Sequence, residues 1–128
     1  MTEARETALR RLGEGDIVYA DIADSGTAVC LVLEVTETAI QARDICRDGE
    51  FIFDRMTGVA PCPWQNNRLS CRITSVARLP PDMHDVLVRY HEKFVGRASV
   101  PIEEWRMSDE EIRAFGGATD IWEEETLP

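Results

Sequence analysis

Two repeating patterns of apolar residues divide the chain. From residue 16 to about residue 79, apolar and polar residues mostly alternate, which is the period of a β-strand. Four apolar residues, Met83, Leu87, Tyr90 and Phe94, then recur at spacings of four, three and four, the period of a helix buried along one side. An earlier run, residues 2–12, also places its apolar residues on one helical stripe. The patterns predict a block of strands with helices on both sides.

Turn residues divide the alternating block into five predicted strands. They cover residues 16–22, 27–35, 39–46, 50–55 and 69–79, and the proline-containing segment 59–68 is interpreted as a loop. Asp48-Gly49 predicts a tight hairpin, because a type I′ turn requires positive φ at both central positions. The second strand is apolar on both faces. It therefore needs cover on both, from a barrel interior on one side and a packed helix on the other.

Three helices are predicted around the strands. The first covers residues 2–12 and ends before Gly13, and the second covers residues 81–95 after the Pro80-Pro81 pair. Ser108 followed by Glu111 forms a capping box, which predicts a short helix over residues 109–115. Gly116-Gly117 is interpreted as its end. Residues 120–127 beyond it are expected either to be disordered or to dock through Ile121 and Trp122.

These elements predict a mostly β fold with α (α+β). The expected architecture is a small five-stranded antiparallel SH3-like barrel, with a packed helix after the fifth strand and short flanking helices. The entry Gly15-Asp16-Ile17-Val18 resembles the start of small barrels in ribosome- and polymerase-associated proteins, although the glycine pattern of nucleic-acid-binding versions is missing after Ser25-Gly26. The 128 residues suffice for one domain. Residues 1–95 form its helices and barrel, and residues 96–128 form an acidic C-terminal extension of it.

The charge of the chain is acidic and unevenly distributed. The net charge is −10, of which residues 27–79 contribute nothing and residues 96–128 contribute −6. Such a field opposes binding to a nucleic-acid backbone. The longest apolar run, residues 28–33, is far shorter than the roughly 20 residues of a membrane-spanning helix. The first residues also lack the features of a secretory signal. We therefore expect a cytoplasmic protein without membrane contact.

Cysteines and histidines do not form a recognisable motif. Among Cys30, Cys46, Cys62 and Cys71, no two have the spacing of a zinc knuckle or redox pair, so the cysteines in strands are expected to be small buried groups. Cys62 lies between two prolines and could be reactive. His84 and His91 are seven residues apart and are expected at the surface or its boundary. The sequence predicts no metal, cofactor or catalytic residue.

Four arginines and three tryptophans are the candidate contacts for a partner protein. They are Arg43, Arg47, Arg72, Arg78, Trp64, Trp105 and Trp122. Neighbouring strands could gather the arginines into a basic patch on an otherwise negative molecule. The six acidic residues in the same block favour the alternative, in which the arginines pair with them on a solvated face. Tryptophan outside strands serves either as a lid over the core or as a binding hot spot.

Three hypotheses for function remain open. The first is a non-enzymatic protein-binding or adaptor module built on the barrel. The second is an acidic inhibitor or nucleic-acid mimic that occupies a basic surface, which requires the carboxylates of residues 96–125 to form one contiguous face. The third is a small enzyme, which requires a pocket that joins Cys62 or a histidine to other polar groups.

Overall fold

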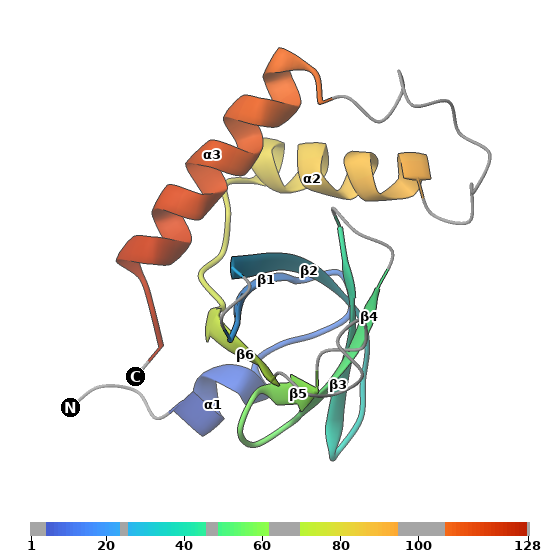
Figure 1. Ribbon diagram of the computed structural model, residues 1–128, viewed down its shortest axis with the longest axis vertical. Helices are drawn as coiled ribbons and strands as arrows, with labels where there is room; N and C mark the ends of the chain where they lie inside the picture. Colours follow the sequence, from blue (N-terminus) through green and yellow to red (C-terminus); the bar gives the residue numbers. More distant parts are fainter. Residues whose placement is uncertain (1–4, 24–25, 46–48, 62–69, 95–106, 128) are drawn as a thin grey trace.

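The computed structural model describes residues 5–23, 26–45, 49–61, 70–94 and 107–127. Within these ranges the elements are α1 (Arg5–Arg10), β1 (Ile17–Ile22), β2 (Gly26–Val35), β3 (Ala39–Asp44), β4 (Glu50–Asp54), β5 (Val59–Pro61), β6 (Ser70–Ser75), α2 (Pro81–Phe94) and α3 (Asp109–Glu124). Figure 1 shows a curved sheet with α2 and α3 above one end and α1 at the other. The predicted α+β class is confirmed.

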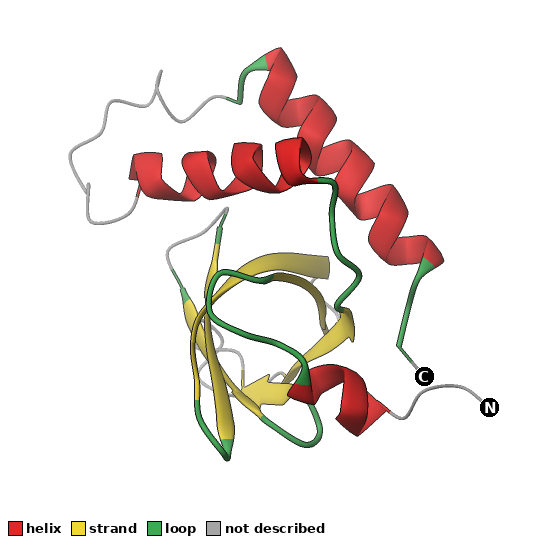
Figure 2. Ribbon diagram, turned by 180° about the vertical axis from the view of Figure 1, so that it is seen from behind, coloured by secondary structure: helices red, strands yellow, loops and turns green. Residues whose placement is uncertain are grey.

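The strands form one antiparallel sheet in the order β4-β3-β2-β1-β6-β5. The sheet curls into a nearly closed barrel (Figure 2), in which a tight turn joins the two outer strands. In that turn the Gly58 N–H donates to the Asp54 carbonyl, and the Ile73 N–H on β6 donates to the carbonyl of Gly58. Residues 59–61 were predicted as loop but form β5. The prediction was wrong here because a three-residue strand that contains a proline has no alternation of its own and is defined by its partner β6.

The two faces of β2 explain how the molecule is layered. Ala28, Cys30 and Val32 point into the barrel core, whereas Val29 and Leu31 belong to a second core under α2 and α3. The sequence prediction that β2 is covered on both sides is confirmed. The barrel core also holds Leu9, Ile22, Ile40, Phe51, Phe53 and Ile73, and the second core also holds Ile17, Tyr19, Leu87, Tyr90, Ala118 and Trp122.

Helix α3 is longer than the sequence predicted. Its capping box at Ser108 is present, with the Ser108 side chain accepting from the Glu111 N–H, but the helix continues through Gly116 and Gly117 to Glu124. Two interior glycines cost about 1 kcal/mol each relative to alanine. Burial of Trp122, which is fully enclosed, outweighs that cost. The glycine pair therefore does not end the helix, and residues 120–124 are docked.

The strand predicted over residues 69–79 ends at Ser75. Beyond it, residues 76–79 leave the sheet and connect to α2. The Ala77 carbonyl accepts a hydrogen bond from the Trp122 indole Nε1–H at 3.1 Å, so contact with α3 replaces contact with a neighbouring strand. None of the described helices is long and apolar enough to cross a membrane.

Candidate functional site

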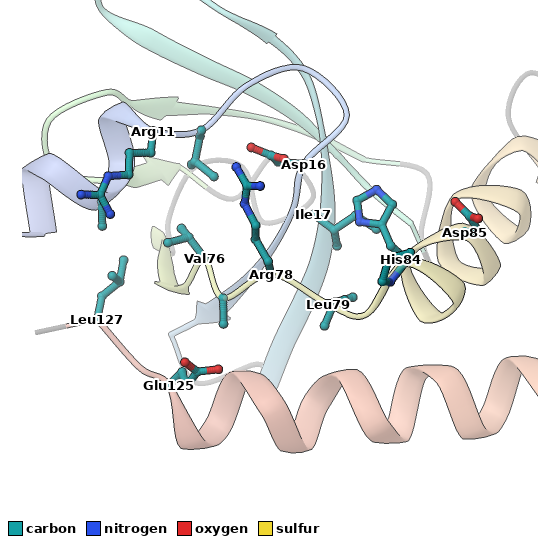
Figure 3. A pocket seen from close by; sticks show the side chains of 14 residues that line it. Arg11, Asp16, Ile17, Val76, Arg78, Leu79, His84, Asp85, Glu125 and Leu127 are labelled. Atoms are coloured by element: carbon teal, nitrogen blue, oxygen red, sulfur yellow. The ribbon is translucent and has the colours of Figure 1, made fainter.

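A groove of about 660 Å³ lies where the barrel meets the connection to α2. Figure 3 shows side chains from α1, β1, the residue 76–79 connection, the start of α2 and the chain after α3 converging on it. Its floor is largely apolar and includes Ala8, Leu12, Ile17, Val76, Leu79 and Leu127. Its rim carries Arg11, Asp16, Arg78, His84, Asp85 and Glu125. The volume and this mixture are typical of ligand sites, which span roughly 300–1,000 Å³.

The groove exists because β1 and β6 separate. Pairing between them reaches Tyr19 and Ser75 and includes a bulge next to Tyr19. The two earlier residues of β1, Ile17 and Val18, pair with β2 on one side and have no β6 partner in the register. Because residues 76–79 turn away toward α2, the space beside Ile17 stays open. The break in strand pairing therefore produces the concavity.

The chain after α3 forms one wall of the groove. The Leu127 N–H donates to the Thr74 carbonyl at 2.7 Å, and the Ser75 hydroxyl donates to the Glu125 carbonyl at 2.7 Å. Trp122 stacks on Tyr19 with ring centroids 5.2 Å apart. These contacts fix residues 125–127 against β6. The sequence left two alternatives for residues 120–127, disorder or docking through Ile121 and Trp122, and the contacts of Trp122 agree with docking.

The charged rim of the groove contains few internal contacts. Asp16 accepts the Gly13 N–H at 2.8 Å, which closes the turn before β1. Arg78 extends across the groove toward Asp16 (Figure 3), and no ion pair joins them. Over the described residues, no hydrogen bond links the His84 imidazole to a carboxylate. The groove thus joins a histidine to polar groups, as the enzyme hypothesis required, without the hydrogen-bonded pair expected of an activated base.

The predicted arginine patch does not form between the strands that are described. Arg43 lies on β3 and Arg72 on β6, and two strands separate these in either direction around the barrel. Arg43 contacts Glu50 on β4 at 3.3 Å, which agrees with the alternative of pairing with nearby acids. Arg72 is exposed on β6. Of the three predicted arginines that the structure describes, Arg78 alone lines the groove, and Arg47 lies outside the described residues.

The tryptophans divide in a similar way. Trp122 is a fully buried core residue, so its surface is used within the fold. Trp64 and Trp105 lie outside the described residues, as do Cys46 and Cys62. Cys30 and Cys71 are fully buried, which confirms the expectation for these two strand cysteines. In the described parts of the chain, no group of three His, Cys, Asp or Glu side chains could hold a metal ion.

His91 was predicted at the surface or its boundary, and that prediction was wrong. It is 8% exposed, and its Nε2 atom is buried without a hydrogen-bond partner. Burial lowers the pKa of its imidazole, and the positive charge of Arg43 lowers the pKa further, against an opposing effect of Glu92. The sequence did contain a signal, because His91 follows the buried Leu87 by four residues and therefore shares its helical stripe.

Arg5 is a second buried polar group that the sequence did not indicate. Its Nε–H donates to the Thr57 carbonyl at 2.8 Å, while Nη1 and Nη2 are buried without partners. Burial lowers the pKa of the Arg5 guanidinium, and the nearby positive charge of Arg72 lowers it further. The site joins α1 to the turn before β5. Neither Arg5 nor Thr57 is among the residues that line the groove.

The carboxylates of α3 form two groups. Asp109, Glu110 and Glu111 lie in its first turn and Asp120, Glu123 and Glu124 near its end, with Arg113 and uncharged residues between them. The inhibitor hypothesis requires one contiguous acidic face over residues 96–125, and it stays a prediction, because residues 96–106 lie outside the described residues. Comparison with protein-family models, with curated proteins and with solved structures finds no match.

Proposed function

We propose that this protein is a non-enzymatic protein-binding module and that the groove holds a segment of its partner. The observation that carries the proposal is the groove itself, which has an apolar floor and a charged rim at a break in strand pairing. An apolar floor supplies affinity by desolvation, and a few polar groups at its rim fix orientation. Partner proteins commonly insert short apolar segments into such sites.

The side chains of the rim support binding more than catalysis. Arg78 is exposed and makes no ion pair with the described residues, so it is available to a partner. His84 is half-buried at the start of α2, with Asp85 beside it. Adjacent helical residues point about 100° apart, so these two do not face one another. General base catalysis needs a base that a partner group orients, and His84 has no such contact in the described chain.

Site-specific photo-crosslinking tests the proposal. A photoreactive amino acid is placed at Arg78 in the full chain, and a matched control chain carries it at Ile52, which is 63% exposed on β4 and away from the groove. In the source cells we expect a discrete crosslinked protein from position 78 and none from position 52. Introducing Val76→Arg on the groove floor should remove that product, because a charge on the floor would be desolvated by the occupant.

Two outcomes would overturn the proposal. One is equal crosslinking from both positions, which would indicate non-specific contact. The other is a product from position 78 that Val76→Arg does not affect, which would place the partner beside the groove and not in it. Circular dichroism and a urea titration of each variant confirm that it is folded before the comparison is made.

A small enzyme that acts through His84 is the second candidate. The observation in its favour is that the groove brings His84, Asp16 and Asp85 onto one rim. A library of small metabolites screened by thermal shift distinguishes it, because a ligand that binds only the folded state raises Tm. This candidate predicts a compound that stabilises the wild type, is turned over, and is no longer turned over by His84→Gln. Binding without turnover would exclude it.

A further inference from the structure

The main chain of Ile17 is unpaired on the side that faces the groove. The Val32 N–H donates to the Asp16 carbonyl at 2.8 Å, so that carbonyl points toward β2. In a trans peptide unit the C=O and the following N–H point in opposite directions, and therefore the Ile17 N–H points away from β2. Among the described residues no main-chain group pairs with it, since the register with β6 includes neither Ile17 nor Val18.

The Ile17 carbonyl points the same way. The Tyr19 carbonyl lies on the β6 side, where the Thr74 hydroxyl donates to it at 3.3 Å. Main-chain groups in a strand alternate between its two edges, so the carbonyls of residues two apart share an edge. Ile17 therefore presents one donor and one acceptor to the groove. This is the pair that a neighbouring antiparallel strand uses.

The edge of β6 that faces away from β1 shows how this fold satisfies unpaired main-chain groups. Beyond the end of β5, β6 would expose its Thr74 carbonyl, and the Leu127 N–H of the C-terminal segment binds it. The chain thus places a segment of its own against one open strand edge. The edge at Ile17 lies across the groove and receives no corresponding segment among the described residues.

We propose that the groove takes its occupant by β-strand addition, as an extended apolar segment of a partner protein that pairs with Ile17. This inference rests on the proposed function and specifies its mode of recognition. In an added strand alternate side chains point to one face, so those at every second position would contact Leu12, Val76 and Leu79 on the apolar floor. Main-chain pairing supplies affinity, and the floor selects small or branched apolar side chains.

The charge of the rim favours an occupant that is neutral or basic. The rim carries three carboxylates, from Asp16, Asp85 and Glu125, and two guanidinium groups, from Arg11 and Arg78. The whole chain has a net charge of −10. A positive flanking residue on the occupant would be attracted by this field, whereas a negative one would be repelled. The occupant is accordingly an extended apolar segment with a lysine or arginine beside it.

Selection from a random linear peptide library displayed against the full chain tests the inference. We expect enriched peptides with apolar residues at every second position and a basic flank. Each enriched peptide is then synthesised with N-methylation at one residue at a time. Methylation at the residue opposite Ile17 should weaken binding by about tenfold, because it removes one main-chain hydrogen bond and adds a clash. Methylation at the next residue, whose N–H points away, should change it little.

Amide chemical shifts of the protein give the second readout. The Ile17 amide should shift on addition of the peptide, and the amide of Ile52 on β4, whose side chain is exposed, should not. Peptides that bind in the groove without alternation and tolerate methylation at every position would overturn strand addition while leaving the proposed function intact. A library that yields no peptides, or only peptides that shift residues away from the groove, would contradict both proposals.

Discussion

At the scale of single residues, Gly58 allows α1 to approach the turn before β5. Its φ is +70°, a region that residues with a Cβ rarely adopt. A Cβ at this position would lie 2.6 Å from Arg5 Nη2 and about 3.1 Å from the Leu9 side chain. The absence of a side chain thus serves two purposes, the turn and the packing of α1. The sequence shows a Thr57-Gly58 turn signal but not the helix above it.

Replacing Gly58 with alanine should therefore destabilise the fold. We expect Gly58→Ala to lower the free energy of unfolding by about 1–3 kcal/mol, the cost of holding a residue with a Cβ at positive φ. The Arg5 guanidinium, whose Nη atoms have no partner to lose, can shift and relieve part of the clash. Urea denaturation measures the change. Gly13→Ala is the matched control, since a Cβ there meets nothing within 4 Å, and it should change stability by less than about 0.5 kcal/mol.

His91 gives the fold a pH dependence. Its pKa in the folded protein is lowered by burial and by Arg43, so the unfolded chain binds a proton more readily than the folded one. The free energy of unfolding is therefore highest, as far as His91 affects it, above the unfolded pKa of about 6.5. It decreases as pH falls from there toward the lowered pKa of the folded protein. Glu92 opposes the effect and reduces its size. A histidine that gains an acidic partner on folding would have the opposite effect, because its raised pKa makes the fold more stable as pH falls.

Substitution of His91 should remove this dependence. We expect the urea midpoint of the wild type to decrease between pH 7.5 and pH 5.5, and the decrease to be smaller in His91→Phe, which keeps a flat ring in the buried position. His84→Gln, on the groove rim of the same helix, serves as the control and should retain the wild-type decrease. An equal decrease in wild type and His91→Phe would show that other groups carry it.

At the scale of elements, the local pattern of apolar residues predicted the strands and helices that bury one regular face. The alternation of β3 and β4 and the stripe of α2 each indicate in sequence which side is buried, and the structure places these elements within a few residues of the prediction. β5 and the second half of α3 depend on contacts distant in sequence. Ala114, Ala118 and Trp122 recur at a spacing of four across the glycines, and this was the signal that α3 continues. The groove combines five separate segments, which no local pattern relates.

The glycines of α3 provide a test of that explanation. A Cβ at Gly116 meets nothing within 4 Å, so Gly116→Ala should stabilise the protein by about 0.5–1 kcal/mol through helix propensity alone. At Gly117 a Cβ would lie 2.7 Å from the Met83 Cε, where α3 crosses α2. Gly117→Ala should therefore gain less or become destabilising. Thermal denaturation compares the two, and an equal gain in both would show that the crossing is loose.

At the scale of the whole molecule, the charge is concentrated at the ends of the chain. Residues 27–79, which form most of the barrel, have no net charge, whereas residues 96–128 have −6. Helix α3 carries carboxylates at both ends and no basic residue in its last turn. Negative charge is favourable at a helix N-terminus, where the dipole is positive, and unfavourable at the C-terminus. Carboxylates therefore stabilise the first turn of α3 and destabilise its last turn.

A pair of charge reversals separates the local effect from the global one. Glu124→Lys and Asp109→Lys both change the net charge from −10 to about −8, which relieves the same long-range repulsion. At low ionic strength we expect Glu124→Lys to stabilise the protein by about 0.5–1 kcal/mol and Asp109→Lys to destabilise it or leave it unchanged, since the dipole adds in one case and subtracts in the other. Urea midpoints in about 0.02 M and 1 M NaCl measure this, and salt should reduce the difference because the Debye length falls to about 3 Å. Equal stabilisation by both variants would mean that repulsion across the acidic extension outweighs the helix dipole.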